Sequence, residues 1–210
     1  MNFFFYSSQK YRPRVSTGFS IIELIVALTI FITLTSVMLF NYNSMNTRLT
    51  LDTLAHQIAQ WTRETQISAM SVKSHAGSYN AGYGLHFDTL VPKQFIFFAD
   101  INGDKIYTPG GTCGDVASEC VQIVNLLKGN AIAMLCGENK GNPQGACPTG
   151  LETLMDTDIV FTRPDPDAFI NGEYSLSSRN VYARNQITVQ AVTGYSRTVE
   201  VWTTGQVSVK

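Results

Sequence analysis

A long unbroken apolar run stands near the start of the chain. Residues 19–40 form a run of 22 without glycine or proline and with a single charge, Glu23. As a helix this run would measure about 33 Å, close to the apolar thickness of a bilayer. Polar residues follow it, beginning with Asn41. The pattern predicts a membrane-spanning helix over residues 19–40.

A helical period continues beyond this run, but with apolar residues on one face only. The members of the stripe recur at steps of three and four: Leu51, Leu54, Ala55, Ile58, Trp61, Thr65, Ala69 and Val72. Gly77, preceded by Lys73 and His75, has the composition of a helix end. We expect residues 41–76 to be an amphipathic continuation, so that one helix runs from Phe19 to about His75 and packs its stripe against a core.

After Gly77 the period changes to the alternation that is typical of strands. Short candidate strands lie at residues 83–87, 94–98, 121–124, 131–135 and 158–161. The C-terminal segment alternates most clearly, and turns at Gly194 and Gly205 divide it into a meander. This order indicates an α+β fold, in which the helix stripe covers one face of an antiparallel sheet within a β-rich head of residues 77–210.

The distribution of charge gives the apolar run a direction. Lys10, Arg12 and Arg14 precede it, and the next basic residue is Arg48. Because positive flanks stay in the cytoplasm, we expect the head to lie outside a cytoplasmic (inner) membrane that the chain crosses once. Charged residues make up 15% of the chain, against about 25% in soluble domains. The run exceeds the roughly 7–15 residues of a secretory h-region, and a plain signal-anchor is the alternative.

The residues at the start of the run carry a more specific pattern. A basic leader is followed by the string Gly18-Phe19-Ser20-Ile21-Ile22-Glu23-Leu24. This resembles the type IV prepilin signature of a basic leader, Gly, a cleavage site, Phe, and Glu at the fifth position of the mature chain. The resemblance implies a leader of residues 1–18. It also implies that a prepilin peptidase cuts between Gly18 and Phe19 and methylates the new amine of Phe19.

Glu23 is the one charge within the apolar run. A carboxylate in a membrane helix costs about 2–3 kcal/mol, so a partner is expected. The resemblance implies that this partner is the Phe19 amine of a neighbouring subunit, and that the helix assembles with other pilins or pseudopilins. Two charges that are costly in apolar surroundings then compensate each other. The alternative is a Glu23 that lies among lipid headgroups.

The order of elements also resembles the minor pseudopilins of type II secretion and the related FimT-like pilins, known as the H-type group. In that group a strand with an Asp-Asn-Gly turn follows the helix, and a Gly-turned hairpin ends the chain. Residues 98–104 and 197–209 fit this description. Residues 109–150 depart from it.

Four cysteines lie in the segment expected outside the membrane: Cys113, Cys120, Cys136 and Cys147. Oxidation is expected there, and three pairings are possible. We favour the two local ones, Cys113–Cys120 and Cys136–Cys147, because each closes a short loop. A zinc site would need tighter spacings.

Asp100, Asn102 and Asp104 place oxygen side chains at alternate positions, as calcium loops do. However, Gly103 precedes the third ligand, and Gly111 stands where a closing Glu would be expected. The other interpretation is a hairpin with a type I′ turn on Asn102-Gly103. Both interpretations stay open, and the hairpin turn is preferred. Calcium is the only candidate cofactor.

No sign of an enzyme is visible in the sequence. His56, His75 and His86 lie on separate expected elements, without a Ser/His/Asp or Cys/His set or a phosphate-binding Gly-rich motif. The resemblance to type IV prepilins implies the first hypothesis, a structural subunit of a type IV pilus or a type II secretion-like filament.

Two other function classes remain open. One is a DNA-uptake pilin, although the net charge of −1, which becomes more negative without the basic leader, disfavours nucleic acid. Its patch would comprise Arg179, Arg184, Arg197 and Lys210, opposed by Glu200. The other is a membrane-anchored binding ectodomain that never polymerises.

Overall fold

A computed structural model describes residues 18–71, 74–75, 77, 81–138, 147–148, 151–175 and 178–210. The expected leader with its basic residues, and most of the loop between Cys136 and Cys147, lie outside the described residues. The chain forms two compact units, Met1–Asn43 and Ser44–Lys210. Helix α1 (Ile21–Met70) contributes residues to both.

The first unit contains the apolar part of α1. Its segment Ile21–Leu39 has a mean hydropathy of 2.4, none of it is buried, and it is long and apolar enough to cross a membrane. Hydroxyl groups in this segment are satisfied within the helix, since Thr29 and Thr33 donate to carbonyls one turn earlier at 2.8 Å. The segment therefore exposes an almost wholly apolar surface.

In the second unit, α1 buries the stripe expected from its sequence. Leu51, Ala55 and Ile58 are fully buried. Thr62 and Thr65 are also buried, and their hydroxyls bond back to the carbonyls of Ile58 and Trp61. The expected helix end near His75 is wrong, since α1 ends at Met70. His75 Nε2 instead donates a 2.9 Å hydrogen bond to the backbone carbonyl of Ser118, in the loop that precedes β3.

Within the described residues, eleven strands form two antiparallel sheets, where one sheet was expected. The first sheet has the order β3-β2-β1-β6-β7-β8, and the second has the order β11-β10-β9-β4-β5. The strand bounds in the first are β1 Gly82–Asp88, β2 Gln94–Asp100, β3 Cys120–Asn125, β6 Asp156–Thr162, β7 Asp165–Ser175 and β8 Ser178–Tyr182. Those in the second are β4 Ala131–Glu138, β5 Leu151–Leu154, β9 Arg184–Gln190, β10 Ser196–Trp202 and β11 Val207–Val209.

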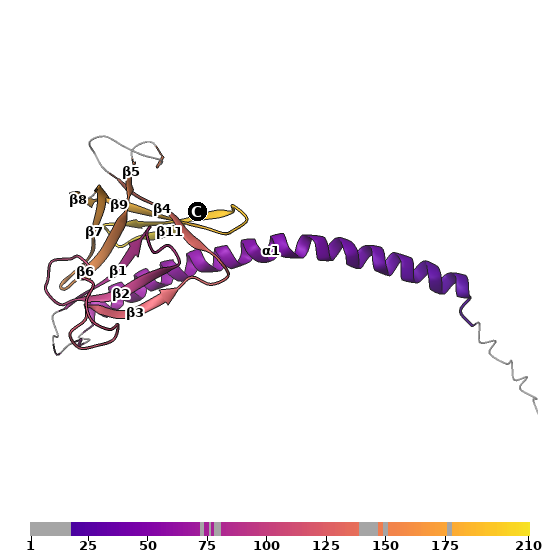
Figure 1. Cartoon of the computed structure of the whole chain (residues 1–210), viewed down its shortest axis with the longest axis horizontal. Coiled ribbons are helices and arrows are strands. Elements are labelled where there is room, and N and C mark those ends of the chain that lie inside the picture. The colour runs from indigo at the N-terminus through magenta and orange to yellow at the C-terminus, as the bar shows by residue number, and fades with distance from the viewer. Residues whose placement is uncertain are drawn as a thin grey trace, which may run out of the picture. The chain divides into compact units, whose positions relative to one another are not determined.

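The strands gather around the later part of α1, and both sheets share one apolar core with it (Figure 1). Trp61 of the helix packs on Phe95 and Phe97 of β2, with ring centroids 6.2 and 5.8 Å apart. Ile187 and Val199 of the second sheet are fully buried in the same cluster. The α+β class predicted from the sequence is confirmed.

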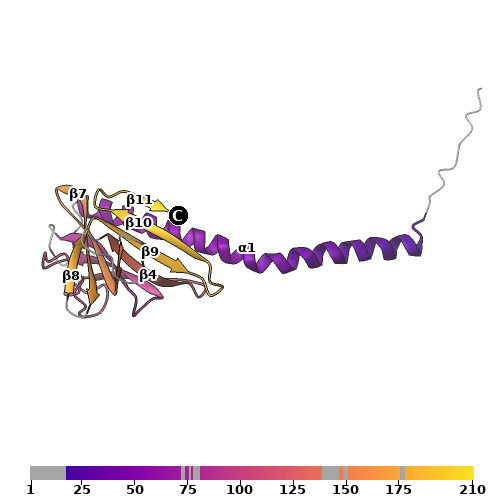
Figure 2. The same cartoon turned by 90° about the horizontal axis from the view of Figure 1, so that it is seen from above.

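The expected C-terminal meander is confirmed. β9, β10 and β11 pair in succession as antiparallel neighbours and lie side by side in Figure 2. Gly194 and Gly205 take φ angles of +86° and +77° at the two turns. These angles suit glycine because it lacks the Cβ that makes this region strained for other residues.

Three strands were not expected from the sequence, namely β5, β7 and β8. β7 begins with the exposed residues 165–167, whose Asp-Pro-Asp composition is more typical of a loop than of a strand. The type I′ hairpin on Asn102-Gly103 is also wrong. Gly103 has a φ of +80° but Asn102 is not among the residues of positive φ, and β2 reaches its partner β3 only after a long loop.

Candidate functional site

Gly18 and Phe19 lie immediately before α1, in open surroundings. Among the described residues, none has an atom within 4 Å of a Cβ built on Gly18, and Phe19 is 83% exposed. The local backbone therefore leaves space around the peptide bond that joins them. This openness is what access by a peptidase requires.

Glu23 occupies the first turn of α1. The Ser20 carbonyl accepts hydrogen bonds from the backbone N–H groups of Glu23, at 3.0 Å, and Leu24, at 3.2 Å. Ser20 and Glu23 thus have the Ser-x-x-Glu spacing of a capping box, a signal that the sequence interpretation missed. A carboxylate at this end also complements the helix dipole. Within the described part of the chain, Glu23 makes no side-chain hydrogen bond or ion pair, so its carboxylate is available for a partner outside the chain.

In the head, a polar network lies on neighbouring strands of the first sheet. Strand register places His86 of β1 opposite Asp158 of β6, and Asp158 opposite Asn171 of β7. Arg179 reaches the same place from β8, the edge strand. Four strands therefore each contribute one member, although the residues are up to 93 positions apart in the sequence.

The carboxylate of Asp158 is the centre of this network. Its side chain is fully buried, one oxygen lies 2.7 Å from His86 Nδ1, and the other accepts from Arg179 at 2.8 Å. The guanidinium also donates to Asn171 Oδ1 at 2.9 Å and to Asp156 at 2.5 Å. A buried carboxylate is costly unless its oxygens are paired, and here both are.

Burial and neighbouring charges act on the pKa of Asp156 in opposite directions. Burial raises its pKa, and this outweighs the lowering effect of the Arg179 guanidinium, while the nearby Asp158 raises the pKa further. Arg179 forms ion pairs with both Asp156 and Asp158, and Glu173 is a third acidic neighbour at 3.9 Å. The local charge balance is acidic.

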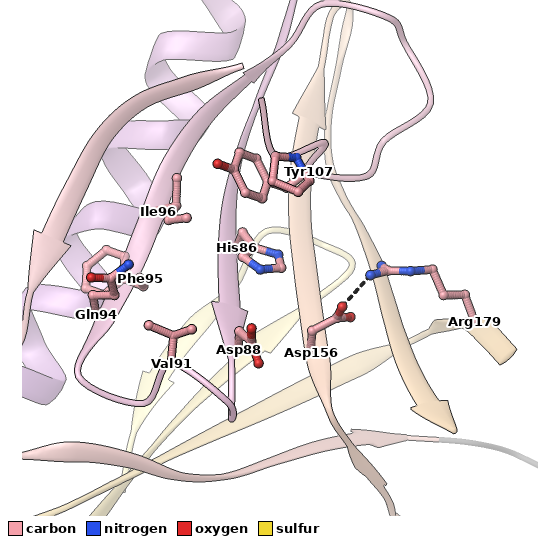
Figure 3. A pocket seen from close by; sticks show the side chains of 10 residues that line it. His86, Asp88, Val91, Gln94, Phe95, Ile96, Tyr107, Asp156 and Arg179 are labelled. Carbon is pink, nitrogen blue, oxygen red and sulfur yellow. Dashed lines mark hydrogen bonds and ion pairs between the residues drawn. The ribbon is translucent and has the colours of Figure 1, made fainter. Parts of the chain in front are cut away.

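A cavity of about 390 Å³ opens beside this network (Figure 3). His86 and Asp156 face it together with Asp88, and Tyr107 covers the imidazole with a ring separation of 4.9 Å. Val91, Ile96 and Pro109 add apolar walls. Its described lining contains no serine, threonine or cysteine, so the His86–Asp158 pair has no adjacent nucleophile of these types. The arrangement offers carboxylate, imidazole and apolar contacts to a small group.

The oxygens of the candidate calcium loop are largely used within the loop. Asp100 is buried and accepts backbone N–H groups from Gly103, at 2.7 Å, and Lys105, at 3.1 Å. Asp104 accepts from Ile106 N–H at 2.8 Å and from the Asn102 amide at 2.9 Å. Burial raises the pKa of Asp100 in spite of these bonds. No group of three or more His, Cys, Asp or Glu placed for a metal ion occurs in the described chain. The geometry favours a role in shaping the loop.

The two local disulfides are present, Cys113–Cys120 and Cys136–Cys147, with Cα separations of 4.7 and 5.9 Å. The first holds the loop ahead of β3 against the start of that strand. The second is attached to β4 through Cys136. Both pairs are the local ones that the sequence favoured.

The basic residues proposed as a DNA patch are all engaged by carboxylates. Arg179 pairs with Asp156 and Asp158, and Arg197 pairs with Asp52 of the helix. Arg184 and Lys210 both contact the buried Glu200, at 3.7 and 2.9 Å. These pairs leave the four cations substantially neutralised, which disfavours phosphate binding at this place.

No known protein family, no curated protein and no solved structure was found to match this chain.

Proposed function

We propose that the chain is a structural subunit, of the minor pilin or pseudopilin kind, of a type IV pilus or a type II secretion-like filament. The observation that carries the proposal is the string from Gly18 to Glu23 at the start of an exposed apolar helical segment. A compact α+β unit, Ser44–Lys210, follows in the same chain. This combination suits a prepilin that is processed at Phe19 and anchored through its helix.

The exposed surface of the segment Ile21–Leu39 supports assembly through the helix. Its large side chains are half or more exposed, including Phe31 at 65% and Ile32 at 61%. A continuous apolar surface of this size needs another apolar environment. Lipid supplies it before assembly, and the corresponding helices of neighbouring subunits supply it within a filament. Glu23, which has no partner in the described chain, then meets the Phe19 amine of a neighbour.

The head is assigned to the outer side of the cytoplasmic membrane. The basic residues ahead of the apolar segment favour this orientation. Two disulfides within the second unit support it, since disulfides persist outside the cytosol and are rare within it. Within the pilin class, the H-type minor pseudopilins and FimT-like pilins are the proposed group, on the order of elements and the C-terminal meander.

The cavity beside His86 favours a second candidate, a membrane-anchored binding ectodomain that does not polymerise. It offers carboxylate, imidazole and apolar contacts within one space of about 390 Å³. The two candidates differ in what the first unit does. A filament subunit must release its leader and associate through its helix, whereas an ectodomain needs only to stay in the membrane.

Replacement of Glu23 distinguishes these candidates. Glu23→Val should leave membrane insertion and the head intact, because it makes the segment more apolar and lies far from the head in sequence. It should reduce the share of the protein in sheared or crosslinked filament fractions, since stranding a neighbour's amine costs about 3–5 kcal/mol.

The matched control is Glu64→Val, the same change at an exposed position of α1 in the second unit. We expect it to be incorporated as the wild type is. Wild-type incorporation of Glu23→Val at an equal membrane level would refute the pairing and favour the ectodomain.

A further inference from the structure

Two loops of the head lie beside the first turns of α1 in the second unit. The β3–β4 loop, residues 126–130, reaches the helix through Lys128, whose Nζ donates to Thr50 Oγ1 at 3.3 Å. The β9–β10 turn, residues 191–195, reaches it through Tyr195, whose ring lies 4.4 Å from the Arg48 guanidinium. Both loops therefore lie beside the part of α1 with which the second unit begins, through Thr50 and Arg48.

This end of the head exposes apolar side chains. Leu49 of the helix is 62% exposed, Leu127 is 72% exposed, and Val192 is 84% exposed. The two loops are neighbours, since a Cβ on Gly129 would lie 3.0 Å from Val192 Cγ2. Leu49, Leu127 and Lys128 also line one shared groove. We call the set Arg48, Leu49, Leu127, Lys128 and Val192 the rim.

Arg48 and Lys128 give this apolar surface a positive charge. Among the residues the structure describes, neither Arg48 nor Lys128 is paired with a carboxylate. The nearby Asp52 is engaged by Arg197. An exposed apolar surface with unneutralised basic residues suits an anionic bilayer surface, where interfacial segments combine both features.

Chain connectivity places the rim within reach of a bilayer. Leu49 follows the end of the apolar segment, Leu39, by ten residues, which is about 15 Å along a helix. The headgroup layer accounts for about 5–8 Å of that distance. Membrane helices tilt by about 20° on average and by up to about 40°. Such a tilt brings one side of a domain attached to the helix closer to the lipid surface.

We propose that, before assembly, the rim rests on the anionic lipid surface through which the chain is anchored. Leu127 and Val192 enter the headgroup layer, and Arg48 and Lys128 lie against anionic headgroups. This contact holds the head against the membrane, and it must be released when the subunit leaves the bilayer. The inference rests on the proposed membrane anchoring and is independent of filament assembly.

Depth-dependent fluorescence quenching tests the contact in the full chain. Single copies are placed in nanodiscs of phosphatidylcholine and phosphatidylglycerol whose acyl chains carry bromine near the headgroup. The reporters are Val192→Trp and, independently, Leu127→Trp, with the wild type giving the background of Trp61 and Trp202. We expect several-fold stronger quenching of both reporters than of the control below.

The control reporter is Val116→Trp. Val116 is 71% exposed, but its loop lies beside His75, beyond the opposite end of α1. From Leu49 to Met70 the helix alone advances by about 32 Å. A control at this place is about as exposed as Leu127 and should stay clear of the lipid.

Charge is tested in the same discs. Arg48→Glu combined with Lys128→Glu should reduce the quenching of Val192→Trp to the control level, as should discs of phosphatidylcholine alone.

If both reporters in correctly inserted protein are quenched no more than Val116→Trp, the inference is wrong. Quenching that needs two copies in a disc would assign the rim to a subunit contact and overturn it as well. A chain that fails to enter discs would instead refute the anchoring.

Discussion

Glu200 illustrates how a single buried charge organises the end of the chain. It is 2% exposed and accepts hydrogen bonds from Gln186 at 2.6 Å and from Lys210 at 2.9 Å. Burial opposes its charge, but these bonds and the charges of Lys210 and Arg184 outweigh burial and hold the pKa of Glu200 below its ordinary value. Glu200 of β10 thereby joins Gln186 of β9 to Lys210, which follows the short strand β11, while the backbone of β11 pairs with β10.

This lowered pKa predicts a dependence of stability on pH. An acid whose pKa is lower in the folded state stabilises the fold above its unfolded pKa, about 4.3, and loses that contribution as the pH falls through the folded pKa. Glu200→Gln should lower the free energy of unfolding by about 1–3 kcal/mol near pH 7. The difference should shrink as the pH drops below about 4.

Urea unfolding of the two proteins across this pH range gives the measurement. Glu64→Gln makes the same chemical change on an exposed part of α1 and should alter stability by less than about 0.5 kcal/mol. A Glu200→Gln protein as stable as the wild type at pH 7 would show that the cluster contributes nothing.

The helix and strands that could be predicted are those in which apolar residues recur at regular steps along the sequence. The stripe of α1 and the alternating strands β9 and β10 carry apolar side chains at regular steps, so their buried faces follow from the sequence. β7 and β8 were missed because their composition resembles that of loops. Polar residues such as Asn171, Glu173 and Arg179 face the network, and pairing with β6 decides their conformation.

The candidate site in the head was missed for a related reason. His86 and Asp158 are 72 positions apart, and only the strand register brings them together. Knowing each strand does not reveal which residues of two strands face each other. The motif around Gly18 and Glu23 could be found because all its members are neighbours in sequence.

The packing role of α1 is tested by a matched pair of isoleucines in its second-unit part. Ile58 is fully buried, whereas Ile67 is 67% exposed. Ile58→Ala should lower the free energy of unfolding by about 2–5 kcal/mol, because it removes transfer energy and leaves a cavity. Ile67→Ala should change it by less than about 0.5 kcal/mol. Denaturant unfolding in detergent, followed by Trp61 fluorescence, separates the two, and equal effects would contradict the packing of this stripe.

The two disulfides bear both on the stability of the fold and on the side of the membrane where the head lies. Each closes a short loop, with sequence separations of 7 and 11. Replacing either pair with serines should cost about 2–3 kcal/mol in the free energy of unfolding. Non-reducing peptide mapping of protein extracted from membranes should recover both pairs. Free thiols in protein from cells with an oxidising envelope would contradict the outward placement of the head.

The N-terminus of the mature protein decides whether the proposed processing of this chain takes place. Protein extracted from cells with an active prepilin peptidase should begin at Phe19 and carry a methyl group on that amine, as read by mass spectrometry of the N-terminal peptide. Gly18→Leu, which places a bulky side chain at the open position before the cut, should keep the chain starting at Met1. A wild-type chain that still begins at Met1 in the same cells would show that the chain is not a processed filament subunit.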